Sequence, residues 1–145
     1  MKYFISKIVT TEFSTLSFVS PKEVTAGEPS IIHFAYDRVG DEELHGIDYQ
    51  GELDVQVILD MQHPECQVEE VTFDTVADRL KECRFAKEIN EQTVSNIRSK
   101  YSVDTELKIM KMDPASADYE VMIAWIESCR AEGTAGKIAL GIKQA

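Results

Sequence analysis

The chain has 145 residues, 43% hydrophobic and 28% charged, a composition that is typical of a folded domain and excludes an intrinsically disordered chain. No apolar run approaches the roughly 20 residues that a membrane-spanning helix needs, and Lys7 interrupts the first apolar stretch before a signal peptide could form. We therefore expect a soluble protein with no membrane contact, folded as a single domain over residues 1–145.

The formal net charge of -11 is concentrated in the middle of the chain. Residues 37–82 hold fourteen acidic and three basic residues, whereas acidic and basic residues balance before and after this segment. A negative field repels nucleic acid and attracts basic partners, so we expect no direct nucleic-acid binding. The acidic partner surface that this charge predicts consists of Asp41, Glu42, Glu43, Glu69 and Glu70. The alternative is that these carboxylates only keep the protein soluble.

Short runs of alternating apolar and polar residues predict that residues 1–60 are mainly strands. The expected strands cover residues 2–10, 13–19, 30–36, 44–49 and 53–59. The third is apolar on both faces, as an interior strand would be, and the fourth is expected to be a short edge strand. The fifth has the clearest pattern, with four apolar residues on one face: Leu53, Val55, Val57 and Leu59.

Helical spacing replaces the strand pattern after residue 71, so residues 72–133 are expected to be mainly helical. Residues that favour helix N-caps stand where three of these helices would begin: Thr72, Ser102 and Asp113. A further helix is expected over residues 90–100, and Gly133 is placed to end the last helix.

Strands followed by helices predict an α+β fold, with an N-terminal antiparallel β-sheet packed against C-terminal helices. The last residues, 134–145, are expected to form either a weak helix or a tail.

Histidines and cysteines are the side chains that would carry metal or nucleophilic chemistry here. His63 and Cys66 have metal-ligand spacing, but zinc sites usually combine two such pairs, and a turn at Pro64 beside a buried thiol explains the same residues. A cysteine nucleophile would need one of the three histidines as its base, and no local motif marks such a pairing: His33, His45 and His63. The cysteines are expected to be small apolar core residues: Cys66, Cys83 and Cys129. We therefore expect no cofactor, no metal and no enzymatic activity.

The last third of the chain carries a family resemblance. The residues concerned are those from Ile97 to Lys108, Tyr119, those from Trp125 to Arg130, and Gly133. They resemble the helical tail of small proteins that tailed bacteriophages and prophages encode near their virion genes. The resemblance implies a bacteriophage structural or virion-assembly protein of the head, neck or tail, located in the virion or the host cytoplasm. Such a protein acts through contacts with other protein subunits, including self-association.

The localised negative charge supports an alternative function. An acidic protein can mimic nucleic acid and inhibit a host DNA-binding enzyme, as anti-restriction and anti-CRISPR proteins do, because complementary potentials steer partners together. An enzyme that uses a cysteine or a carboxylate pair is a third hypothesis, and the sequence motifs support it least.

Overall fold

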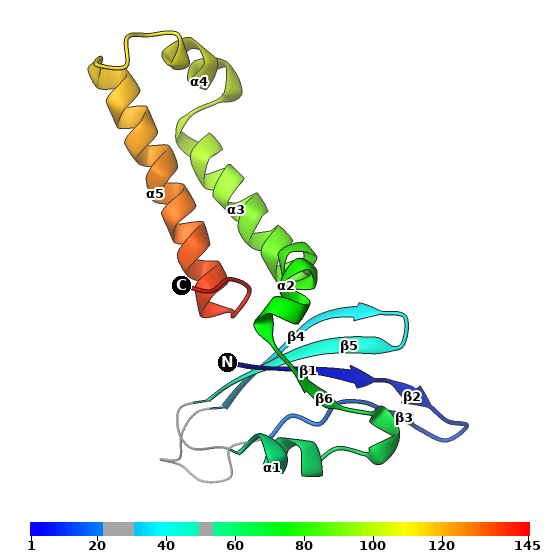
Figure 1. Ribbon diagram of the computed structural model, residues 1–145. Coiled ribbons are helices and arrows are strands. Elements are labelled where there is room, and N and C mark those ends of the chain that lie inside the picture. Colours follow the sequence, from blue (N-terminus) through cyan, green and yellow to red (C-terminus); the bar gives the residue numbers. More distant parts are fainter. Residues whose placement is uncertain (22–30, 50–53) are drawn as a thin grey trace. The chain divides into compact units, whose positions relative to one another are not determined.

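The computed structural model describes residues 1–21, 31–49 and 54–145. Its contacts divide the chain into two compact units, the sheet unit Met1–Cys83 and the helical unit Arg84–Ala145 (Figure 1). The predicted α+β class is confirmed, since the antiparallel sheet is N-terminal and the helices are mostly C-terminal. The prediction of one domain over residues 1–145 stays a prediction.

The sheet unit is built on four antiparallel strands: β1 (Lys2–Lys7), β4 (Ile31–Val39), β5 (Glu42–Tyr49) and β6 (Glu69–Val71). Their order is β4-β5-β1-β6, so β5 and β1 are central in the described sheet. A two-residue turn joins β4 to β5, and its first residue, Gly40, has a φ of 65°, the sign that a type II′ hairpin turn requires. A separate small hairpin pairs β2 (Val9–Thr10) with β3 (Thr15–Leu16).

The strand order corrects two predictions. The segment predicted as an interior strand belongs to β4, at an edge of the described sheet, and Ile32 there is 48% exposed. The segment predicted as an edge strand belongs to β5, a central strand whose Leu44 and Ile47 are fully buried. Apolar content could not distinguish the two, because an edge strand can also carry apolar residues on both faces. Ser30, the first residue of the predicted interior strand, lies outside the described residues.

Both faces of the sheet are covered within the sheet unit. One face forms a core with α1 (Val55–Asp60), made of Phe4, Phe18, Ile47 and Ile58. On the other face the rings of Tyr3 and Phe73 lie 5.9 Å apart, and Phe73 opens α2 (Phe73–Glu82). Neighbouring residues of a strand point to opposite faces, so β1 contributes to both cores at once.

The strand predicted over residues 53–59 is wrong, because α1 covers most of this segment, while Leu53 lies outside the described residues. Asp54 caps the helix by accepting a hydrogen bond from the Gln56 amide at 3.0 Å. The helix buries Ile58 completely, although the alternating pattern assigned Ile58 to the polar face. Packing of this one side chain against the sheet overrides the local strand pattern.

The helical unit consists of α3 (Arg84–Lys100), α4 (Val103–Met110) and α5 (Ala117–Ala139). Its buried core joins all three helices and contains Ile97, Ile109, Met122, Ile126 and Cys129. The predicted burial of the cysteines is confirmed, since all three thiols are buried and free: Cys66, Cys83 and Cys129.

Two of the three predicted N-caps are confirmed. The hydroxyls of Thr72 and Ser102 accept hydrogen bonds from the amides three residues later, at 3.4 and 3.2 Å. Asp113 instead accepts a bond from the Ala115 amide in the turn before α5, and Ser116 caps that helix. Proline is compatible both with a turn and with the first turn of a helix. The Asp113-Pro114 pair therefore did not show which residue caps α5.

The predicted helix end at Gly133 is wrong, because α5 continues to Ala139. Of the two alternatives for residues 134–145, a weak helix or a tail, the structure shows helix for residues 134–139. Leu140 caps the helix, and Gly141 follows it with a φ of 69°. The Ile142 amide donates to the Lys137 carbonyl at 2.9 Å and the Gly141 amide to the Ile138 carbonyl at 3.0 Å, which is the Schellman arrangement. Ile142 is only 3% exposed, so this end of the chain is packed.

Gly133 has a packing role inside α5. A β-carbon at this position would lie 2.5 Å from the Thr93 hydroxyl oxygen on α3, closer than atoms can approach. That hydroxyl is itself held by a 2.9 Å hydrogen bond to the Ile89 carbonyl. A β-carbon at Gly136, one turn later, would lie 3.6 Å from the Ile89 side chain, an ordinary contact. Position 133 of α5 therefore has no room for a side chain beside Thr93 of α3.

Substitution by alanine is expected to change the stability of the protein in opposite directions at the two glycines. Gly133→Ala should destabilise the protein by about 1 to 3 kcal/mol, because Thr93 must move. Gly136→Ala should stabilise it by about 0.5 to 1 kcal/mol, because alanine has the higher helix propensity. In a Thr93→Ala background, Gly133→Ala should become stabilising. Urea denaturation followed by circular dichroism measures all three, and equal stabilisation by both single substitutions would contradict the close approach.

Candidate functional site

The acidic residues predicted as a partner surface lie on both faces of the sheet. Strand register places Glu43 and Glu70 on the face covered by α1. It places Glu42 and Glu69 on the face covered by α2, and Asp41 lies in the β4–β5 turn. Because side chains alternate along a strand, residues adjacent in sequence are separated by the sheet. The structure therefore does not bring these five residues together on one face.

Some of this negative charge is matched by basic side chains. Arg79 on α2 binds Asp37 and Glu42, each at 2.5 Å, and Glu70 lies 3.6 Å from Lys2. The hydrogen bonds to Asp37 raise the pKa of Arg79, so its guanidinium is permanently charged. Arg79 thereby joins α2 to the hairpin of β4 and β5.

A chain of polar side chains crosses the face covered by α1. His33 Nε2 lies 2.8 Å from His45 Nδ1, and His45 Nε2 lies 3.5 Å from a carboxylate oxygen of Glu43. The ring of Phe18 stacks on His45, with centroids 4.4 Å apart. Ser6 pairs with Glu43 across β1 and β5, and its side chain is fully buried. A hydroxyl, a carboxylate and two imidazoles thus lie on one face of the sheet in an otherwise apolar core. Among the described residues, three of their atoms have no hydrogen-bond partner: Ser6 Oγ, Glu43 Oε1 and His45 Nε2.

A β-bulge creates this histidine pair. The register of β4 against β5 shifts between Ala35 and Asp37, so that Ala35 lies opposite His45 and His33 opposite Ile47. Without the extra residue, the two-residue turn would place His33 and His45 on opposite faces of the sheet. Sequence analysis named both histidines but missed their pairing, because the bulge has no sequence signal in this hairpin.

Burial controls the protonation of this pair. Desolvation, together with the neighbouring His33, lowers the pKa of His45 to about 4, while Asp37 opposes the shift. Desolvation also lowers the pKa of His33. Both imidazoles are therefore neutral at pH 7 and share a single proton between the two facing nitrogens. Ser6 is enclosed completely, so the cluster acts within the core and its hydroxyl does not face solvent.

His63 and Cys66, the two residues with metal-ligand spacing, differ in their exposure to solvent. His63 is exposed, and its Nδ1 accepts a hydrogen bond from the Glu65 amide at 3.2 Å, whereas Cys66 is fully buried. Burial raises the pKa of the Cys66 thiol, and the neighbouring carboxylates of Glu65 and Glu43 add to the shift. Among the residues that the structure describes, no three histidine, cysteine or carboxylate side chains are placed to hold a metal ion. None of the described helices has the length and apolar character of a membrane span.

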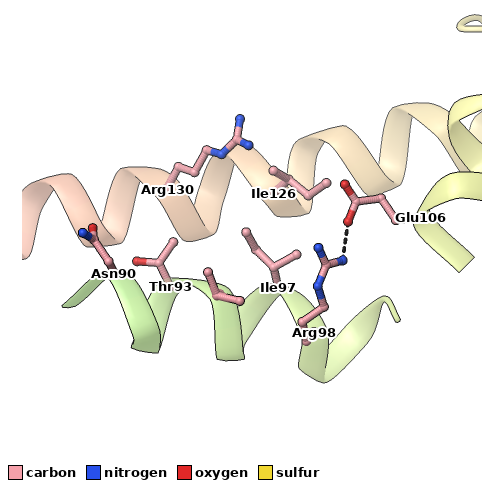
Figure 2. A pocket seen from close by; sticks show the side chains of 8 residues that line it. Asn90, Thr93, Ile97, Arg98, Glu106, Ile126 and Arg130 are labelled. Atoms are coloured by element: carbon pink, nitrogen blue, oxygen red, sulfur yellow. Dashed lines mark hydrogen bonds and ion pairs between the residues drawn. The ribbon is translucent and has the colours of Figure 1, made fainter. Parts of the chain in front are cut away.

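The helical unit carries an open groove of about 340 Å³ between α3 and α5, beside α4 (Figure 2). Its lining residues are Asn90, Thr93, Val94, Ile97, Arg98, Glu106, Ile126 and Arg130. Ile97 and Ile126 form an apolar floor from facing helices, and Val94 is 54% exposed beside them. Arg98 donates to Glu106 of α4 and closes one end of the groove. Grooves of this kind between helices bind apolar segments of other molecules.

An exposed apolar stripe on α4 extends the apolar surface of the helical unit. Val103, Leu107 and Met110 follow one another at helical spacing, and each is about half exposed. A helix that packs only against its own unit normally exposes its polar face. The sequence could not show this exposure, because helical periodicity shows which residues share a face and not whether that face is covered.

The histidine pair makes stability depend on pH. Both imidazoles are neutral in the folded protein but take up protons below pH 6.5 once unfolded, so stability is complete above that pH and falls as the pH decreases towards 4. Between pH 7.5 and 5.5 we expect a loss of about 1 to 1.5 kcal/mol from His45. Urea denaturation at the two pH values should show a smaller difference for His45→Leu, whereas the exposed His63→Gln is the control. An unchanged difference in His45→Leu would contradict the assignment.

Comparisons with known proteins give no family. No family model matches the sequence, and no similar protein was found among curated proteins or among solved structures. The two candidate sites are the open groove of the helical unit and the buried histidine pair of the sheet unit. Each is therefore interpreted from its own geometry.

Proposed function

We propose that this protein acts by docking other polypeptides, and that the groove between α3 and α5 is its binding surface. The observation that carries the proposal is the exposed apolar surface of the helical unit. Val94 in the groove and the stripe of Val103, Leu107 and Met110 on α4 are each about half exposed. Burial of one such side chain contributes about 1 to 2 kcal/mol, so a partner that covers several of them gains enough to bind.

The proposed setting is the assembly of a tailed-bacteriophage virion, as a head, neck or tail component. The segments that carry the resemblance to phage proteins include five of the eight residues that line the groove. Ile97, Arg98 and Glu106 belong to the first of these segments, and Ile126 and Arg130 belong to the second. If the resemblance reflects common function, what is shared is a docking surface. The partners are then other virion subunits or further copies of this chain, and the protein needs no catalytic group.

Substitution of Val94 tests this proposal. Val94→Glu puts a charge in the groove at an exposed position, so the fold should survive while docking should not. Mass spectrometry of purified particles and assembly intermediates from the encoding phage should find the wild-type protein and at least about tenfold less of Val94→Glu. Ser95→Glu makes the same charge change on the same helix outside the groove and should incorporate normally. Absence of the wild-type protein from all such particles would contradict the proposal.

The charge distribution favours a second candidate, an acidic inhibitor that mimics nucleic acid. All the net charge of -11 belongs to Met1–Cys83, whereas Arg84–Ala145 has nine acidic and nine basic residues. The unit boundary thus coincides with the charge boundary. Under this alternative the sheet unit carries the function and the helical unit is neutral support.

Charge reversal separates the two candidates. Asp41→Lys with Glu69→Lys leaves untouched the three carboxylates of the described sheet unit that pair with an arginine or a lysine: Asp37, Glu42 and Glu70. An inhibitor should lose activity against a restriction or CRISPR nuclease with these substitutions, and its inhibition should weaken as salt increases. A virion component should instead assemble normally with both lysines in place.

A further inference from the structure

The side chains that line the groove between α3 and α5 change from apolar to polar and cationic along its length. Near α4 its surface is apolar, with Val94, Ile97 and Ile126. Towards the other end of the helix pair a second hollow of about 240 Å³ continues it, sharing Asn90, Thr93 and Arg130 with the first. There the remaining lining residues are Gly133, Thr134 and Lys137. An apolar stretch is therefore followed by a polar and cationic one.

The two cations at this end are not matched by carboxylates. Arg130 and Lys137 are seven residues apart on α5, which places them on one side of the helix about 10 Å apart along its axis. In residues 1–21, 31–49 and 54–145, no acidic side chain forms an ion pair with either of them. Arg98, at the apolar end, differs because Glu106 already binds it.

Two acidic residues of the same helices, Glu88 and Glu132, are engaged elsewhere. Glu88 on α3 pairs with Arg84 of its own helix at 3.6 Å. Glu132 on α5 lines the hollow on the reverse side of the helix pair, together with Cys129 and Gly136. Neither Glu88 nor Glu132 therefore neutralises Arg130 or Lys137.

We propose that the groove binds an amphipathic helix of a partner protein whose apolar side chains end in a cluster of carboxylates. The apolar side chains cover Val94, Ile97 and Ile126, and the carboxylates lie against Arg130 and Lys137. A helix suits the groove because the side-chain ridge of a third helix packs into the groove between two neighbouring helices. This inference rests on the proposed docking function and adds the chemistry of the partner.

Charge at the rim of the groove should control specificity more than total affinity. Rim charges remain hydrated, so each contributes modestly to binding, but a like charge in the same place is repelled. A partner with lysines in place of the carboxylates would fit the apolar floor equally well and meet repulsion at Arg130 and Lys137. The choice between the two partners is therefore the measurable property.

Two fluorescein-labelled helical peptides of about 18 residues, a length that spans the groove, test the inference by fluorescence anisotropy. Both carry leucines on one face, and one has three glutamates in a terminal turn where the other has three lysines. We expect the glutamate peptide to bind the full-length protein about tenfold more tightly at low salt, with a smaller preference at higher salt. The double variant Arg130→Glu with Lys137→Glu should reverse the preference.

A matched control is Lys108→Glu with Lys111→Glu, which makes the same charge change in the helical unit at residues that do not line the groove. It should retain the wild-type preference, and circular dichroism should show both double variants folded. Equal binding of the two peptides, no binding of either, or a preference that survives Arg130→Glu with Lys137→Glu would each overturn the inference.

The outcomes also separate this inference from the proposed function. Loss of Val94→Glu from particles together with equal binding of the two peptides would leave docking intact and refute the acidic partner. A clear glutamate preference in a protein that never enters particles would refute the virion role and leave the chemistry of the groove standing.

Discussion

The helical unit depends on the close approach of α3 and α5 at Gly133. The Thr93 hydroxyl occupies the space that a β-carbon would need, and it is fixed by its bond to the Ile89 carbonyl. Two helices held this closely form a single layer with two sides, and a layer of two helices cannot bury both. α4 covers part of the layer through Ile109, and the groove is the part that α4 leaves open. The proposed binding surface is thus a direct consequence of how the helix pair packs.

The sheet unit depends on a different constraint, the bulge between Ala35 and Asp37. One extra residue turns His33 to the face of His45 and so places two imidazoles in an apolar core. The contact between the two imidazoles favours one strand register, because a slip by one residue would move them to opposite faces of the sheet. The same hairpin is tied to α2 through Arg79, which binds Asp37 and therefore also fixes the far side of the bulge. The cluster is best explained as a structural element that fixes the register of the hairpin and lowers the stability of the fold at acid pH.

The charge boundary and the unit boundary coincide, which gives the two functional hypotheses separate locations. The sheet unit carries the net charge, but strand alternation divides its candidate acidic residues between two faces, and Glu42 and Glu70 are engaged with bases. The helical unit is neutral overall, yet three of its cations, Arg98, Arg130 and Lys137, line the groove and its extension beside apolar side chains. A docking function follows from local arrangement in the neutral unit more directly than from total charge in the acidic one.

The sequence by itself determined the α+β class, the N-caps Thr72 and Ser102 and the burial of the cysteines, because these depend on local hydrogen bonds and on composition. It could not determine which strands are central, that residues 55–60 are helical, or that Gly133 lies inside a helix, since each depends on what packs against the segment. The histidine pair and the groove were likewise decided only by tertiary structure. Periodicity tells which side chains share a face, but only the neighbouring elements determine whether that face is buried, paired or left open to a partner.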